Sequence, residues 1–244
     1  MGLDHLALLR ADLARFADAV EHGPPDAPVA GCPGWTLFDL GVHLGDVHRW
    51  VLGALATGGP PTGAHDDPAP TVGSAALAAW VRAGSTRLLT ALDAVDPDAP
   101  TWHPFPVEPK LAGLWRRRQA HEASVHRWDA ERAAGGSPTI DAAFAADGVD
   151  EYWTVMLPRM LQREQRRTPA STVAVTLADT GQRWAVDGGS GLPVLLPAGA
   201  PADAEFTADA ASALLRWWGR PVHVEPVIAG DPSVMDAWLQ LGGA

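Results

Sequence analysis

The spacing of the apolar residues changes near Pro169, and this change constrains the fold more than any other feature of the 244-residue chain. Before Pro169, apolar residues recur at intervals of three and four, which is the period of an amphipathic helix. After it they alternate with small or polar residues, which is the period of a half-buried strand. The sequence therefore predicts an α+β protein, with a helical bundle over residues 1–168 and a small α+β domain over residues 169–244.

Local signals predict where several of the helices begin and end. Thr36, with Asp39 three residues on, resembles a capping box for the second helix. Ser74 is placed to cap the third helix, and Pro158 should kink or break the fifth. We expect the five helices to cover about residues 6–23, 36–55, 74–92, 111–133 and 141–167.

The last part of the chain predicts a hairpin followed by alternating strands and helices. Residues 173–177 and 184–186 alternate on either side of the turn at Asp179, Thr180 and Gly181, which is typical of a β-hairpin. Further on we expect a strand near 205–207, a helix over 208–218, a strand near 222–227 and a helix over 233–241.

Charge and cysteine content exclude several classes of protein. Acidic residues number 29 against 18 basic ones, and the net charge of -11 repels phosphate, so nucleic acid is not an expected partner. Cys32 is the sole cysteine, so no intrachain disulfide can form. The first residues lack the pattern of a signal peptide, and no apolar run approaches 18 residues. We expect a cytoplasmic protein with no membrane partner; the oligomeric state is left open.

One group of polar residues is placed to bind a metal ion. Glu122 and His126 are four residues apart, so their side chains lie on the same, inward-facing side of the fourth helix. His43 lies on the apolar stripe of the second helix, and helical bundles commonly build metal sites from facing helices. Two histidines and one glutamate leave a coordination position open, as in catalytic zinc sites; nickel, iron or manganese are also compatible. A buried, hydrogen-bonded set without metal is the alternative.

Residues near this group could support it or have unrelated roles. Asp129 and Arg118 are candidates for hydrogen-bonding the ligands from outside. His48 lies one turn beyond His43, where it could approach the site, but it is expected to pack at the helix edge. His65 is expected on the surface or in a loop. Cys32 lies before a helix N-terminus, which favours a reactive thiol, but a small half-buried apolar role is the simpler interpretation.

Two stretches of the chain resemble a known family. Residues 31–50, GCPGWTLFDLGVHLGDVHRW, and residues 120–131, AHEASVHRWDAE, resemble motifs of the mycothiol-dependent maleylpyruvate isomerase family. The resemblance implies a DinB-like four-helix bundle followed by a small α+β domain. It also implies that His43, Glu122 and His126 bind a divalent metal, usually zinc, and that mycothiol, an actinobacterial thiol, is the cosubstrate.

The same resemblance implies a chemistry and a further site residue. A metal-held thiolate would attack an electrophilic carbon of a small unsaturated acid, giving either cis–trans isomerisation or thiol transfer. The segment WWGRPV resembles the region from which the isomerases take an arginine for substrate carboxylates, which implies that role for Arg220. A capping or surface role for Arg220 is the alternative.

Two other functions fit the same residues. One is a metal-dependent hydrolase, in which hydroxide takes the open position and no thiol is needed. The other is a non-catalytic module that binds a ligand in the bundle. The substrate itself cannot be read from the sequence.

Overall fold

The computed structural model describes residues 2–63, 65–222 and 224–242. Two compact units make up the chain: residues 1–104 with 108–139, and residues 105–107 with 140–244. No helix in these described ranges is long and apolar enough to cross a membrane.

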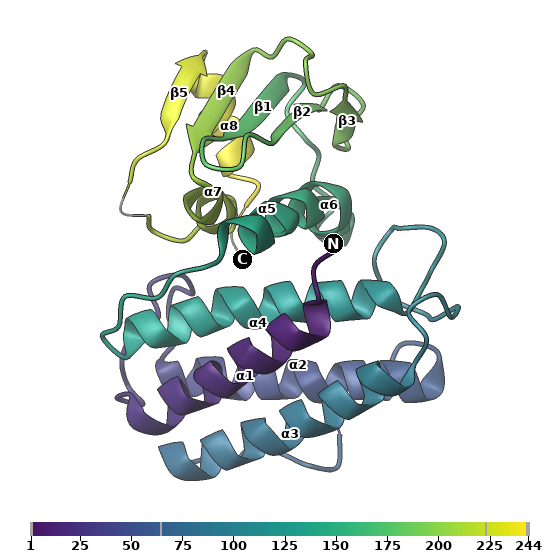
Figure 1. Ribbon diagram of the computed structural model, residues 1–244, viewed down its shortest axis with the longest axis vertical. Coiled ribbons are helices and arrows are strands. Elements are labelled where there is room, and N and C mark those ends of the chain that lie inside the picture. Colours follow the sequence, from purple (N-terminus) through teal and green to yellow (C-terminus); the bar gives the residue numbers. More distant parts are fainter. Residues whose placement is uncertain (1, 64, 223, 243–244) are drawn as a thin grey trace. The chain divides into compact units, whose positions relative to one another are not determined.

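The first unit is a bundle of four helices, which Figure 1 shows lying side by side. They are α1 (His5–His22), α2 (Leu37–Thr57), α3 (Ser74–Ala94) and α4 (Gly113–Ala133). α1 packs against α3 and α4, and α2 packs against α3. The predicted apolar stripes form the core, including Leu9, Phe16, Leu40, Leu44, Leu77 and Trp115, all of which are almost fully buried.

The helix starts follow the predicted capping at α2 but not at α3. Thr36 Oγ1 accepts from the Asp39 amide at 3.2 Å, and an Asp39 carboxylate oxygen accepts from the Thr36 amide at 2.9 Å, so the capping box is confirmed. Ser74 is the first helical residue of α3, and the cap is Gly73, which has no side chain to accept a bond. The chain enters α3 with φ +90° at Gly73, a conformation that glycine adopts without steric cost.

α2 and α3 approach closely where small residues face large ones. A Cβ on Gly45 would lie 1.9 Å from the Trp80 ring, and one on Gly41 would lie 2.7 Å from Leu77. The Trp80 indole therefore packs directly on the α2 backbone. The Arg49 guanidinium lies 3.6 Å from the centre of the same ring. This packing fixes the position of α2, the helix that carries His43.

The second unit starts with a helix that is interrupted, as predicted from Pro158. α5 (Ala142–Glu151) passes through a π-helical turn, η1 (Tyr152–Met156), into α6 (Leu157–Glu164). Pro158 lies in the first turn of α6, where its missing N–H is tolerated. The change in helical geometry therefore comes just before the proline, which confirms that the segment is not one continuous α-helix.

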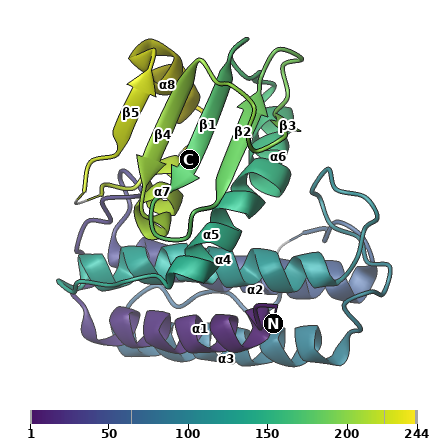
Figure 2. The ribbon, with the colours of Figure 1, turned by 45° about the horizontal axis from the view of Figure 1, so that its top comes forward.

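A mixed five-stranded sheet and two helices complete this unit. In Figure 2 the strands β3 (Val194–Leu196), β2 (Arg183–Asp187), β1 (Thr172–Leu177), β4 (Ala204–Ala208) and β5 (Val227–Gly230) lie in that order. Only β1 and β4 pair in parallel. α7 (Ala210–Trp217) and α8 (Pro232–Leu239) pack on the sheet, and Trp153, Trp217, Trp238 and Phe206 fill its core.

The predicted fold class, a helical bundle followed by a small α+β part, is confirmed, with two errors in the strands. The hairpin, β4, α7 and α8 lie near their predicted positions. β3 was not predicted because it is only three residues long. The strand expected near 222–227 is β5, displaced to Val227–Gly230; residue 223 lies outside the described residues. Proline at 226 cannot donate to a sheet ladder, so pairing starts after it.

The predicted domain boundary between residues 168 and 169 stays a prediction. The compact units divide the chain earlier, between Thr139 and Ile140, because α5 packs against α7 of the second unit.

Candidate metal centre

α2 and α4 bring together the three residues predicted to bind a metal. Glu122 Oε1 lies 3.4 Å from His43 Nε2 and 3.4 Å from His126 Nε2. One potential ligand atom from each residue lies within 4.8 Å of the other two. The two imidazole rings stand nearly perpendicular, with centroids 5.1 Å apart. The three side chains thus place one polar atom each in a single small cluster.

These separations fit a small divalent cation. Two ligands of a tetrahedral cation with bonds of about 2.1 Å lie about 3.4 Å apart. The two contacts of Glu122 Oε1 have this length. Three ligands would leave the fourth coordination position of a tetrahedral cation open for another molecule. His43 is partly exposed and Glu122 less so, so the group is accessible from one side.

Arg118 orients the glutamate. Its Nη2 donates to Glu122 Oε2 at 2.9 Å, and the Arg118 side chain is almost fully buried. One carboxylate oxygen is thereby held away from the histidines, and the other faces them. The predicted supporting role of Arg118 corresponds to this contact; its partner is one turn away on the same helix.

Asp129 orients His126. Asp129 Oδ2 lies 3.1 Å from His126 Nδ1, and the Asp129 side chain is fully buried. A carboxylate only accepts hydrogen bonds, so Nδ1 carries the proton and donates. In the neutral form of the ring, the lone pair would then be on Nε2, the nitrogen that lies nearer to Glu122. This is the arrangement by which carboxylates fix metal-binding histidines.

The protonation of the group follows from these contacts. Burial alone would raise the pKa of Glu122, but hydrogen bonds from His126 and His43, with the charge of Arg118, hold it well below its usual value. Burial alone would lower the pKa of His126, but its bonds to Asp129 and Glu122 raise it instead. Glu122 is therefore ionised over the physiological pH range.

Cys32 lies beside this group and is fully buried rather than half-buried. Its thiol lies 3.9 Å from Asp129 Oδ2, toward which it donates. Cys32, His126 and Asp129 form a second set of potential ligand atoms within 4.8 Å of one another. Asp129 Oδ2 and His126 Nδ1 already bond to each other. The Cys32 thiol is therefore a second donor to the same carboxylate oxygen.

His48 is in the core, so its predicted place at the helix edge is wrong. It follows Leu44 by four residues and precedes Val51 by three, which puts it on the buried stripe of α2. Neither ring nitrogen has a hydrogen-bond partner among the described residues. Burial first, and the charge of Arg49 second, lower the pKa of His48 to about 3. The ring is therefore neutral at physiological pH.

A cavity of about 640 Å³ opens along α2 from His43. Its walls are α2 between His43 and Thr57 and the following loop, including Pro61 and His65. His65, predicted to lie on the surface or in a loop, is part of this loop, where it lines the cavity and pairs with Asp46 at 2.9 Å. No periodic pattern could have shown this contact, since it joins a helix to a loop.

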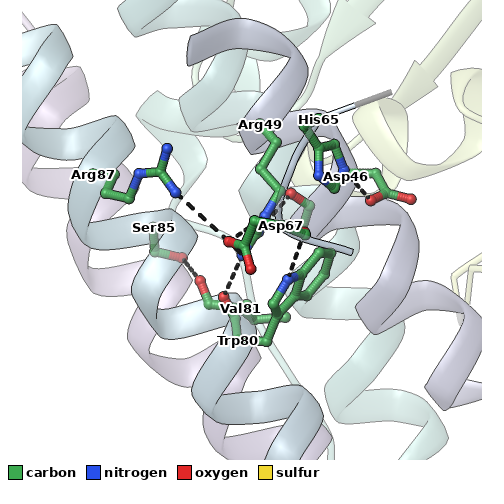
Figure 3. A network of polar contacts seen from close by, with 9 residues as sticks. Asp46, Arg49, His65, Asp67, Trp80, Val81, Ser85 and Arg87 are labelled. Atoms are coloured by element: carbon green, nitrogen blue, oxygen red, sulfur yellow. Dashed lines mark hydrogen bonds and ion pairs between the residues drawn. The ribbon is translucent and has the colours of Figure 1, made fainter. Parts of the chain in front are cut away.

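The loop is attached to α2 and α3 by the polar network of Figure 3. Asp67 accepts from the buried Arg49 guanidinium at 2.6 Å, and its carbonyl accepts from the Trp80 indole at 3.1 Å. Arg87 of α3 lies 3.6 Å from the same carboxylate. These contacts hold the loop as one wall of the cavity.

Arg220 lies in the second unit, just after α7. Its side chain is almost fully buried, and its Nη1 donates to the Trp218 carbonyl at 2.8 Å. An exposed surface position for Arg220 is therefore wrong.

Fold and site together define a class: a helical bundle with a polar three-residue group inside it, joined to a small mixed-sheet unit. Within this class, the sequence profile described as the mycothiol maleylpyruvate isomerase N-terminal domain matches residues 6–131. The chain belongs to that family, which confirms the resemblance of the two sequence motifs.

Solved structures extend the likeness to the C-terminal unit. A crystal structure of the mycothiol-dependent maleylpyruvate isomerase matches with a TM-score of 0.62 and 12% identity, covering 93% of this chain and 92% of that one. A histidine-to-alanine variant of the mycothiol-dependent maleylpyruvate isomerase matches with a TM-score of 0.58 and 13% identity, over the same shares. At these identities the likeness shows the fold alone. No curated protein sequence matches the chain.

Proposed function

We propose that this protein is a divalent-metal enzyme that uses mycothiol to isomerise, or to transfer a thiol to, a small electrophilic or unsaturated acid. The metal, zinc in this proposal, binds His43, Glu122 and His126. The observation that carries the proposal is the 3.4 Å spacing of Glu122 Oε1 from both imidazole Nε2 atoms, with one side of the group open. The thiol cosubstrate implies the cytoplasm of an actinobacterium.

A bound divalent cation would keep a thiol in its thiolate form at neutral pH. The protein's own residues prepare the place for it. Arg118 holds Glu122 with its other carboxylate oxygen toward the histidines, and Asp129, by accepting from Nδ1 of His126, leaves Nε2 as the nitrogen that would bind the metal. Addition of a thiolate to a cis double bond, rotation about the resulting single bond and expulsion of the thiolate give the trans isomer. If the carbanion formed by the addition takes up a proton from water instead, the product is a thioether and the thiol has been transferred.

Arg220 holds a substrate carboxylate in this proposal, because a guanidinium pairs with a carboxylate through two parallel hydrogen bonds. We expect Arg220→Ala to raise the KM for an acidic substrate about tenfold or more, with unchanged metal content. Loss of metal from this variant would contradict the role.

Metal analysis tests the ligand set directly. The purified chain should hold close to one divalent ion, and His126→Ala should remove it. His22→Ala is the matched control, since His22 is an exposed histidine at the end of α1 that bonds only to the Asp18 carbonyl. Equal metal content in the His126→Ala variant and the parent would reject the ligand set.

Mass spectrometry then separates the enzymatic alternatives. Loaded enzyme, mycothiol and a panel of unsaturated acids should give isomerised acids or thiol adducts, and omission of mycothiol should abolish turnover. Turnover without thiol would instead identify a hydrolase. Metal-independent binding without turnover would identify a binding module.

A further inference from the structure

The cavity beside His43 has the chemistry of a binding site in its own right. It opens along α2 from one of the proposed metal ligands, and its volume of about 640 Å³ is within the range for small-molecule sites. The part of a ligand that lies beyond the metal would therefore extend over Val47 and Trp50, one and two turns further along α2.

Trp50 gives this cavity a fixed aromatic wall. Its side chain is 38% exposed, which is unusual for a large apolar residue in this chain. The rings of Trp102 and Trp115 hold it, each with its centroid 6.0 Å from that of Trp50. Trp115 is itself fixed, because its indole N–H donates to the Trp102 carbonyl at 3.0 Å. An indole face held rigidly at a cavity wall suits the flat, C–H-bearing face of a saturated ring.

Polar groups line the same cavity within reach of such a ring. The Asp46 side chain is 49% exposed, and one of its carboxylate oxygens accepts from His65 Nε2 at 2.9 Å. His65 Nδ1 has no hydrogen-bond partner within the described part of the chain, although the atom is shielded from solvent. The hydroxyl of Thr62 is a further donor and acceptor at this cavity. These groups together suit a ligand that carries several hydroxyls.

The charges at the cavity disfavour an acidic ligand. Arg49 lines it, but its Nε and Nη2 bond to Asp67 and its Nη1 bonds to the Gly45 carbonyl. Of the two imidazoles at the cavity, His65 already pairs with Asp46, and His43 lies 3.4 Å from Glu122. A ligand carboxylate would meet the Asp46 charge with no guanidinium able to turn toward it.

We infer that this cavity binds a neutral, hydroxyl-rich ring, such as a sugar or cyclitol, that stacks on Trp50 and bonds to Asp46 and His65. The inference rests on the proposed function in one respect. Mycothiol carries its acylated cysteine on an uncharged sugar–cyclitol unit, which would lie here while the sulfur reaches the group at His43. The acid substrate must be recognised elsewhere.

Calorimetric titration with the sugar–cyclitol unit alone, carrying an acetyl group in place of the cysteine so that its nitrogen stays an uncharged amide, tests this directly. The unit should bind the parent, and Trp50→Leu should weaken binding about tenfold, whereas Trp50→Phe should retain most of it. Asp46→Asn should weaken binding by a similar factor. Asp66→Asn is the matched control, because Asp66 is an exposed carboxylate of the same loop that does not line the cavity. Thermal unfolding of each variant confirms that it is folded.

Several results would overturn the inference. One is that the parent does not bind the unit; another is that Asp46→Asn and Asp66→Asn lose the same affinity for it. A folded Trp50→Leu variant that binds the unit as tightly as the parent would also overturn the inference, as would displacement of the unit by maleate. The probe has no sulfur, so it should also bind the metal-free His126→Ala variant. Sugar binding without any thiol chemistry would leave this inference standing and remove the proposed function. If turnover depends on the thiol but Trp50→Leu does not change sugar binding, the proposed function stands and this inference fails.

Discussion

Replacing Asp129 with asparagine tests whether the carboxylate behind His126 prepares the metal centre. Asp129 Oδ2 lies 3.1 Å from His126 Nδ1, in a side chain that solvent does not reach. Asparagine keeps the size and one acceptor oxygen but removes the charge. It can also turn its NH2 toward Nδ1, which would move the ring proton to Nε2 and remove the lone pair from the site. Losing such a partner costs about 10- to 100-fold in metal affinity, or about 1.4–2.7 kcal/mol.

Competition with a chromogenic zinc chelator measures this affinity in the Asp129→Asn variant and the parent. Asp66→Asn removes an exposed carboxylate and serves as the control for net charge. Unfolding of the metal-free variants by urea separates loss of affinity from loss of fold. If Asp129→Asn is folded and binds zinc as tightly as the parent, Asp129 does not act through His126 and the reasoning is wrong.

Four further predictions concern α2, the helix that carries His43. Thr36→Ala should destabilise the fold by about 1 kcal/mol through loss of the cap. The pKa of Asp39 is lowered by hydrogen bonds from the Thr36 side chain and backbone, so Asp39 stabilises the fold above its unfolded pKa. That stabilisation is lost as the pH falls through the lowered folded value, and urea unfolding of Asp39→Asn should show a flatter acid limb than the parent. Gly45→Ala should destabilise by about 1–3 kcal/mol in thermal unfolding despite the better helix propensity of alanine, since its Cβ would meet the Trp80 ring at 1.9 Å. His48→Leu should raise the free energy of unfolding by about 1–2 kcal/mol with unchanged metal content, because it removes a buried imidazole without hydrogen bonds to described residues; a destabilised or metal-poor variant would contradict this.

Helical spacing predicts which residues of the candidate site lie on one face of a helix. Glu122 and His126 are one turn apart on one helix, so their common direction follows from helix geometry alone. The supporting contacts of Arg118 and Asp129 are equally local, at spacings of four and three residues. The same spacing places His48 in the core, because Leu44 four residues before it and Val51 three residues after it are buried, so the prediction of a helix-edge position did not follow the pattern.

Non-local contacts could not be predicted in this way. Asp46 meets His65 across a loop of irregular sequence, and Trp50 meets Trp102 and Trp115 from three separate segments. No repeating pattern links such positions, so the cavity they surround has no signature in the sequence.

By itself, the sequence determined the two parts of the fold, the apolar face of each long helix and the shared direction of the Glu122 and His126 side chains. Only the tertiary structure decided that His43 of α2 meets them, because that depends on how closely α2 packs within the bundle. The close packing of Trp80 on Gly45 and the attachment of the loop through Asp67 hold α2 in place. Helix periodicity fixes which way a side chain points, but the partner it meets depends on side-chain volumes on other elements.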